Sequence, residues 1–375
     1  MRLLEPLGEV RFRLAAIGDI GMIGAARAVA HRQGYDAALA SLAPALRAAD
    51  LGFANLEFPV GEPAWVRAGR SREFWHEAEL LPALARAGVG VVSIANNHVM
   101  DCGPRGIART REACGAAGMA VVGAGGDLAQ ARAPACVDTP VGKVVFLAYA
   151  APSGDQAGEG IAGLAPLEAS LIREDIGRWR PRAEVLVVSA HWGSMYVDYP
   201  PPRVLELARV LAEGGVDVVL GHHPHVLQGF ERQGRTLTLF SLGDAAFNCH
   251  AGDFHASVGA TTRLESGVFT VLVAGEPGLD VAPLGLDGDG IPHPVDEACA
   301  AAQGDRLKRL SVGMTEAARR FSAESAPTLL RYELEAMGNW ARAGQFDRIA
   351  RLLGSIRPRH LGLLWQALRR SARRT

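Results

Sequence analysis

Residues 91–103 read Val-Val-Ser-Ile-Ala-Asn-Asn-His-Val-Met-Asp-Cys-Gly, an apolar run followed at once by amide, imidazole and carboxylate side chains. The β-branched first half predicts a buried strand. The polar half would lie just past the carboxyl end of that strand, which is where ligand sites gather in open α/β sheets. Taken alone, the same residues could form an Asx turn that carries a surface histidine.

Four other apolar runs end in the same way, and this recurrence favours a shared site. They end in Asp19, in Asn55-Leu56-Glu57, in His191-Trp192-Gly193 and in His222-His223-Pro224-His225. Parallel strands would bring all five polar clusters to one edge of a sheet, where mixed oxygen and nitrogen donors suit a divalent metal ion. Alternating strand and helix patterns as far as residue 122 indicate an α/β fold with right-handed crossovers.

The composition excludes several classes of protein. Apolar residues make up 49% of the 375 residues, and a net charge of −1 gives no electrostatic reason to bind nucleic acid or an anionic membrane. Five scattered cysteines without CxxC spacing favour free thiols. No apolar stretch approaches the ~20 residues of a membrane span, and residues 1–13 contain no signal-peptide run. We therefore expect a cytoplasmic protein without a nucleic-acid or membrane partner; the oligomeric state stays open.

The expected elements divide the chain near residue 290. They include a helix at 36–48, a hairpin at 135–150, a glycine-rich loop of lid length at 152–163, helices at 167–178 and 203–213, and a last strand at 267–273. Helical spacing then replaces strand patterns at 298–343 and 347–370. Residues 1–290 would form the catalytic domain, and residues 291–375 a helical extension packed on it.

The histidine-rich run at 222–225 is the most specific of these patterns. Two imidazoles one residue apart can meet one or two metal ions, with capping histidines after a strand as the alternative. Glu57 is a natural bridge between two ions, and the amide oxygen of Asn97 is typical of sites that also hold bridging carboxylates. His98, near Asp101, suits a general acid/base whose tautomer a carboxylate sets. Mixed ligation favours Mn, Fe or Zn and admits Mg or Ca less readily, and no organic cofactor is expected.

Six blocks of the sequence carry a resemblance to a known family. They are Gly18-Asp19, Asn55-Leu56-Glu57-x-Pro59, Ala95-Asn96-Asn97-His98-x-x-Asp101-x-Gly103, His191-Trp192-Gly193, Gly221-His222-His223-Pro224-His225 and Ser241-Leu242-Gly243-Asp244. Over residues 14–275 the chain is similar to the CapA family, named for capsule and poly-γ-glutamate synthesis, a branch of the calcineurin-like metallophosphoesterases. The resemblance implies a four-layer α/β/β/α sandwich around a dinuclear metal site.

The same resemblance implies a role for each ligand. It places Asp19 and His225 on one ion, Asn97, His191 and His223 on the other, and Glu57 between the two. His98 would be the acid/base. Phosphoesterases carry Asp-x-His in the first block, whereas this chain has Asp19-Ile20-Gly21, which leaves one ion an imidazole short.

Two enzymatic functions and one non-catalytic function fit these residues. Family members in lasso-peptide gene clusters resemble cofactor-independent peptide epimerases, so our main prediction is inversion of an α-carbon in the C-terminal residue of a ribosomal peptide. A metal ion would act as a Lewis acid, and His98 with Asp101 would supply one acid/base group. His250 or His255 would supply the second, unless their loop is an exposed lid with incidental histidines.

The alternatives rest on the same residues. One is metal-dependent hydrolysis of a phosphoester or of a γ-glutamyl or other amide bond, and the other is a non-catalytic peptide-binding module. The retained His98 and histidine ligands disfavour the binding module. The arginines of residues 59–72 could face an anionic substrate or lie in a solvated loop.

Overall fold

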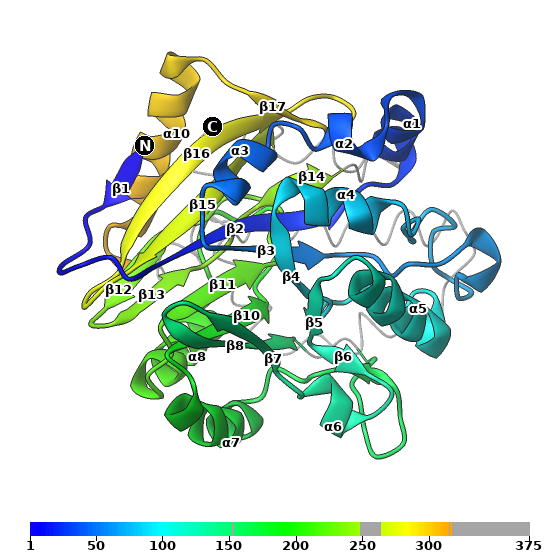
Figure 1. Cartoon of the computed structure of the whole chain (residues 1–375), viewed down its shortest axis with the longest axis horizontal. Coiled ribbons are helices and arrows are strands. Elements are labelled where there is room, and N and C mark those ends of the chain that lie inside the picture. The colour runs from blue at the N-terminus through cyan, green and yellow to red at the C-terminus, as the bar shows by residue number, and fades with distance from the viewer. Residues whose placement is uncertain (152–153, 248–263, 315, 317–375) are drawn as a thin grey trace, which may run out of the picture.

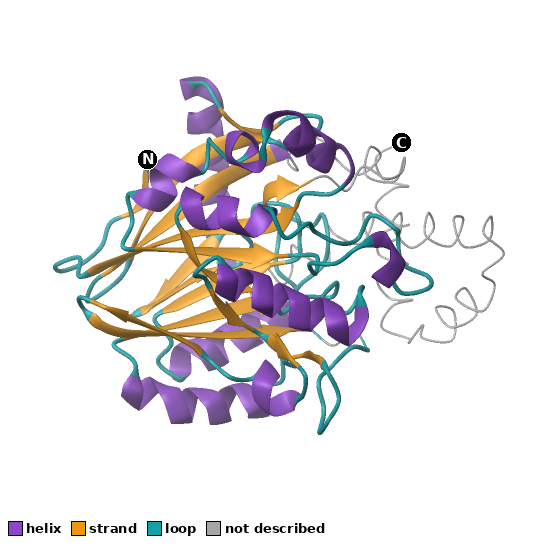
Figure 2. Ribbon diagram, turned by 45° about the vertical axis from the view of Figure 1, so that its right-hand side comes forward, coloured by secondary structure: helices purple, strands orange, loops and turns teal. Residues whose placement is uncertain are grey.

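Two β-sheets packed face to face form the centre of the molecule. The computed structural model describes residues 1–151, 154–247, 264–314 and 316. Helices cover the outer faces of both sheets, so that the layers run α/β/β/α (Figure 2). The predicted α/β class and the four-layer sandwich are therefore confirmed.

The first sheet has nine strands. They are β1 (Arg2–Leu4), β2 (Phe12–Gly21), β3 (Leu51–Leu56), β4 (Val89–Ser93), β5 (Ala120–Val122), β14 (Asp244–Phe247), β15 (Glu265–Val273), β16 (Gly278–Leu286) and β17 (Pro292–Pro294). Their order is β1-β16-β15-β2-β3-β4-β5, with β14 paired to β2 and β17 paired to β16 (Figure 1). Strands β2 to β5 are parallel, which directs their carboxyl ends to one edge.

The second sheet has six strands, in the order β12-β13-β11-β10-β8-β7. They are β7 (Ala135–Thr139), β8 (Gly142–Ala150), β10 (Val185–His191), β11 (Val218–His222), β12 (Phe230–Gln233) and β13 (Thr236–Leu239). The expected hairpin at 135–150 is the antiparallel pair β7 and β8. A separate two-stranded sheet joins β6 (Ala124–Gly125) to β9 (Gly163–Leu164).

Most of the described helices fall into two groups. One group packs with the first sheet: α1 (Gly24–Gln33), α2 (Tyr35–Ala38), α3 (Ala43–Arg47), α4 (Leu80–Ala87) and α5 (Gly103–Ala116). The other contributes buried side chains to the outer face of the second sheet: α6 (Leu128–Ala131), α7 (Ala169–Trp179) and α8 (Pro202–Glu213). A further helix, α10 (Glu297–Ser311), belongs to neither group, because it contacts β12 of the second sheet and β16 of the first. Within the described part of the chain, no helix combines the length and apolar character that crossing a membrane requires.

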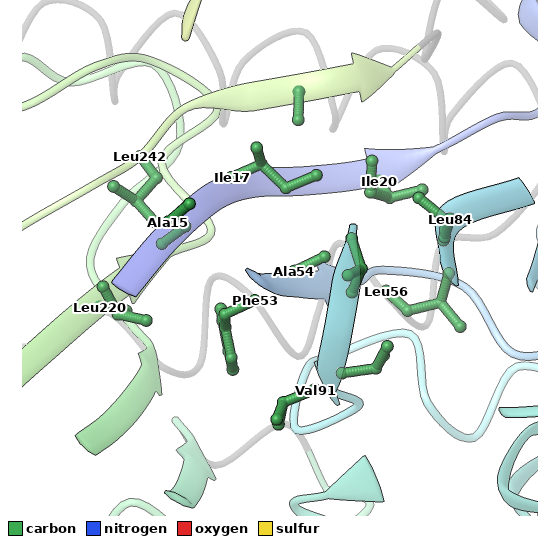
Figure 3. Close-up of a cluster of buried hydrophobic side chains, with 14 of the residues drawn as sticks. Ala15, Ile17, Ile20, Phe53, Ala54, Leu56, Leu84, Val91, Leu220 and Leu242 are labelled. Atoms are coloured by element: carbon green, nitrogen blue, oxygen red, sulfur yellow. The ribbon is translucent and has the colours of Figure 1, made fainter. Parts of the chain in front are cut away.

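Alternation along the strands explains why their sequences are apolar without interruption. In β8, Phe146 faces the core between the sheets, whereas its neighbour Leu147 faces the core under α7 and α8. A strand covered on both faces has no solvated side to carry polar residues. The rings of Phe53 on β3 and Phe146 stack across the two sheets with centroids 5.8 Å apart. Figure 3 shows Phe53 together with Leu220 of β11 in this inter-sheet cluster.

Several sequence-based expectations were wrong. The helix expected at 36–48 is two short helices, α2 and α3, and Pro44 lies in the first turn of α3, where its missing N–H breaks no helical bond. Helix α1 was not expected. Strands β16 and β17 follow the strand expected to be last, and β17 carries the first sheet past residue 290. Of the expected helical extension, α10 lies within the described residues; residues 317–375 and the loop with His250 and His255 lie outside them.

Candidate metal centre

The sequence led us to expect all the polar strand ends at one edge of a single sheet. In the structure they come together from both sheets. Asp19 lies in β2, and Glu57 directly follows β3; both strands belong to the first sheet. His191 ends β10 in the second sheet, and His223 follows β11. The site therefore lies where the carboxyl ends of the two parallel strand sets meet.

One group of potential ligands consists of Glu57, His191 and His223. Each of these side chains offers one donor atom, and the three donor atoms lie within 4.8 Å of one another. Asn97 joins this group, because its Oδ1 lies 2.7 Å from Nε2 of His191. These four residues are the ones predicted for one ion, including the predicted bridge.

The second group consists of Asp19, His225 and Asp244, again with donor atoms within 4.8 Å. His225 Nδ1 lies 2.8 Å from Asp244 Oδ1 and 3.6 Å from Asp19 Oδ2. Asp19 and His225 are the predicted pair. Asp244 lies in a sequence block noted for its resemblance, but no ligand role was predicted for it.

Asn55 connects the two groups. Its Nδ2 donates to Asp19 Oδ1 at 2.8 Å and to Glu57 Oε2 at 2.9 Å. One amide thus holds the two carboxylates side by side. The arrangement leaves Glu57 Oε1 buried and without a hydrogen-bond partner among the described residues.

Unpaired buried atoms test whether a metal ion fits here. Besides Glu57 Oε1, the Nδ1 atoms of His191 and His223 are buried without a hydrogen-bond partner among described residues. Leaving such atoms unpaired destabilises a protein by about 1–3 kcal/mol each. A divalent cation would satisfy Glu57 Oε1, and Nε2 of His191 lies 3.6 Å from that oxygen, so the residues present fit one.

The charges of the first group are arranged for a cation. Burial, and then the charge of Asp19, raises the pKa of Glu57 well above its usual range. Burial, and then the neighbouring His225, lowers the pKa of His223 to about 3, and burial with His223 lowers that of His191. Neutral imidazoles keep a lone pair available for a metal ion. A carboxyl group with a raised pKa loses its proton when a metal ion binds to it.

In the second group, His225 lies between two carboxylates, Asp244 and Asp19. Burial alone would lower the pKa of His225, but Asp244 and Asp19 together raise it to about 9. Burial would likewise raise the pKa of Asp19, yet its contact with His222 and the nearby imidazole charges hold that pKa below its ordinary value.

The backbone around the histidines is itself strained. His223 and His225 have φ of 96° and 54°, in a region that side-chain-bearing residues seldom adopt. The strained turn lets the His223 amide donate to Asp19 Oδ2 at 3.1 Å. His222, which lies in neither ligand group, is fully buried with Nδ1 3.1 Å from Asp19 Oδ1. Such strain collects at functional sites.

Strand β14 explains the departure at residue 21. It pairs in parallel with β2, with Asp244 opposite Asp19 and Phe247 opposite Gly21. A Cβ atom at Gly21 would lie 2.4 Å from the Phe247 ring, which packs against His225 with centroids 4.8 Å apart. The resemblance left this ion an imidazole short, and the structure places the carboxylate of Asp244 beside Asp19 and His225 as a third potential donor.

The predicted acid/base pair lies in the loop after β4. His98 Nδ1 is 2.6 Å from Asp101 Oδ2, and the Asp101 side chain is fully buried. Asn96 holds this loop in place: it donates to the carbonyl of Leu56 at 2.9 Å and accepts from the His98 amide at 3.0 Å. Phe58 packs on the His98 ring at 4.7 Å between centroids. The geometry is that of an oriented imidazole beside the ligand Asn97.

With this geometry in hand, comparison with known proteins is informative. The sequence profile of the bacterial capsule synthesis protein PGA_cap matches residues 13–249. The chain belongs to this family. The match ends just after β14, so the PGA_cap region contains every residue of both ligand groups and the His98–Asp101 pair.

Two PGA_cap relatives have been named for capsule or PGA synthesis. The chain is 27% identical over 299 residues to capsule biosynthesis protein CapA of Bacillus anthracis, covering 77% of this chain and 70% of CapA. It is 29% identical over 236 residues to PGA biosynthesis protein CapA of Bacillus subtilis (strain 168), covering 62% of each. Among solved structures, a 5'-nucleotidase from Candida albicans SC5314 matches with a TM-score of 0.45 and 10% identity, over 86% of this chain and 61% of that one.

Proposed function

We propose that this PGA_cap protein is a metal-dependent hydrolase that cleaves a phosphoester or an amide bond such as a γ-glutamyl linkage. The observation that carries the proposal is the pair of ligand groups joined by Asn55, with the oriented His98 beside them. The relatives' association with capsule and PGA synthesis favours the amide substrate. Mn, Fe and Zn are the ions that this mixture of donors suits best.

The side chains of the two groups would each hold one metal ion. Glu57, Asn97, His191 and His223 would hold one ion, and Asp19, His225 and Asp244 a second. Bound ions would act as Lewis acids toward the substrate and lower the pKa of water. With Nδ1 of His98 directed at Asp101, Nε2 would be the nitrogen that takes a proton from the attacking water and then gives it to the leaving group.

Peptide epimerisation, our main prediction from sequence, has less support. It depended on an ion weakened by the missing imidazole at Gly21, where Asp244 is a potential third ligand, and on His250 and His255, which lie outside the described residues. Nothing in the compared proteins points to it. We therefore place hydrolysis first and keep epimerisation as the outcome that would overturn it.

Incubating metal-loaded protein with poly-γ-glutamate, with bis(4-nitrophenyl) phosphate and with synthetic peptides in D₂O tests both functions. We expect metal-dependent release of shorter glutamyl chains or of 4-nitrophenol, which His98→Gln slows and Arg72→Gln does not. Deuterium gain at a peptide α-carbon without cleavage would instead establish epimerisation. The metal itself follows from reconstituting chelated protein with Mn²⁺, Fe²⁺ and Zn²⁺ separately.

A further inference from the structure

Arg70 joins three loops beside the metal centre. Its Nε lies 2.9 Å from Asp101 Oδ1, and its Nη2 lies 3.5 Å from the carbonyl oxygen of Asn97. The same Nη2 lies 3.7 Å from Asp155 Oδ2, in the loop between β8 and β9. One guanidinium therefore touches the acid/base loop and a loop that leads from the second sheet.

The contact with Asp101 matters because that carboxylate is fully buried. A buried carboxylate is stable only when both oxygens are compensated. Oδ2 lies 2.6 Å from His98 Nδ1, and Oδ1 forms an ion pair with Arg70 that lacks hydrogen-bond geometry, so the charge of the guanidinium compensates this oxygen. Since a carboxylate group is rigid and planar, fixing one oxygen fixes the direction of the other.

Arg67 and Asp155 hold Arg70 in turn. Arg67 donates from its backbone to the carbonyl of Asp101 at 2.8 Å and from Nη1 to Asp155 Oδ1 at 2.7 Å. The Asp155 side chain is only 12% exposed. The loop that carries Arg67 and Arg70 is thus held to the loop of His98 and Asp101 by a backbone hydrogen bond as well as by ion pairs. A loop that is only solvated would need neither.

From these contacts we propose that Arg70 is a positioning residue, which orients Asp101 and through it His98 for proton transfer. The inference rests on the proposed role of His98 and adds Arg70 to the pair formed by His98 and Asp101. Arg70 need not touch the substrate. Two roles were considered for the arginines of residues 59–72, facing an anionic substrate or lying in a solvated loop, and the contacts of Arg70 support a third, positioning.

Replacing Arg70 with Ala leaves two carboxylates, Asp101 and Asp155, facing the space of the lost guanidinium. We expect the Arg70→Ala variant to retain its metal content while kcat toward bis(4-nitrophenyl) phosphate or poly-γ-glutamate falls by about 10- to 100-fold with little change in KM. Guanidinium ion at millimolar concentration should restore much of kcat. Arg72→Ala is the matched control, since Arg72 lies in the same loop and donates to the carbonyl of Pro63.

A readout independent of catalysis separates this inference from the proposed function. The side-chain ¹⁵N resonances of His98, assigned with His98→Gln, should shift in Arg70→Ala, return on addition of guanidinium, and stay unchanged in Arg72→Ala. Unshifted His98 resonances in Arg70→Ala would overturn the positioning role even if hydrolysis is found. Shifted resonances support it even if neither probe is cleaved. Arg70→Lys repeats the measurement should Arg70→Ala fail to fold.

Discussion

The ring of Phe247 fills the space into which any side chain at Gly21 would project, because a Cβ at that glycine would lie 2.4 Å from the ring. Strand β14 brings this ring and the carboxylate of Asp244 to β2 together, with Asp244 opposite Asp19. One short strand thus fills the space beside Gly21 and brings a carboxylate next to Asp19.

Substitutions at Gly21 and Phe247 should have non-additive effects on stability. Gly21→Ala alone should lower the free energy of unfolding by roughly 1–3 kcal/mol through overpacking. In the Phe247→Ala background the same change should have a much smaller effect, because the clashing ring is gone. Denaturant unfolding of the wild type, both single variants and the double variant measures the coupling. Additive effects would mean that the ring moves away freely.

Asp244 should be required for one ion and not for the other. We expect two ions per chain in the wild type and about one in Asp244→Asn, since the amide is a weaker ligand than the carboxylate. His191→Gln should lose the ion of the other group. Metal analysis after dialysis, with the exposed Asp138→Asn as control, checks both. Full occupancy in Asp244→Asn would remove Asp244 from the centre.

His98 should act in catalysis and not in metal binding. In His98→Gln the metal content and melting temperature should match the wild type, while kcat falls by roughly 10²-fold, the usual scale for a positioned acid/base. Steady-state kinetics combined with metal analysis makes the distinction. Loss of metal along with activity would show that His98 is a ligand.

His76 should make stability depend on pH. It is fully buried, donates from Nδ1 to the carbonyl of Phe58 and accepts from the Met22 amide, and burial lowers its pKa to about 3. The unfolded chain binds this proton near pH 6.5, whereas the folded chain does not until about pH 3. Stability should therefore fall as pH drops through this window.

The comparison that isolates this effect is His76→Gln. The variant should be less stable than the wild type at pH 7, but its melting temperature should fall less steeply between pH 6.5 and pH 4. Both proteins should be measured with saturating metal, so that the ligand histidines contribute equally. Parallel slopes would contradict a neutral buried His76.

The sequence revealed the ligands that follow their own strands. Asp19, Glu57 and His191 stand at the ends of apolar runs, and a local pattern is enough to find them. Asp244 could not be found in this way, because its role depends on β14 pairing with a strand far away in sequence. The ring over Gly21 was hidden for the same reason.

The missed parts of the fold have local causes as well. Strands β16 and β17 contain Pro283, Pro292 and Pro294, and proline within a run argues against a strand unless it lies at an edge or irregularity.

The loop at residues 59–72 showed its charges in the sequence but not their partners. Only the fold reveals that Arg70 meets a fully buried carboxylate.

The chain passes from β13 in one sheet to β14 in the other. Among the candidate ligands in the described residues, Asp244 comes last in the sequence, and it lies opposite Asp19 because β14 pairs with β2. Metal capture should therefore follow the docking of the two sheets, unlike in small zinc domains, where the ion drives folding. Refolding with and without metal should show the sheets forming at the same rate, with the ion arriving afterwards.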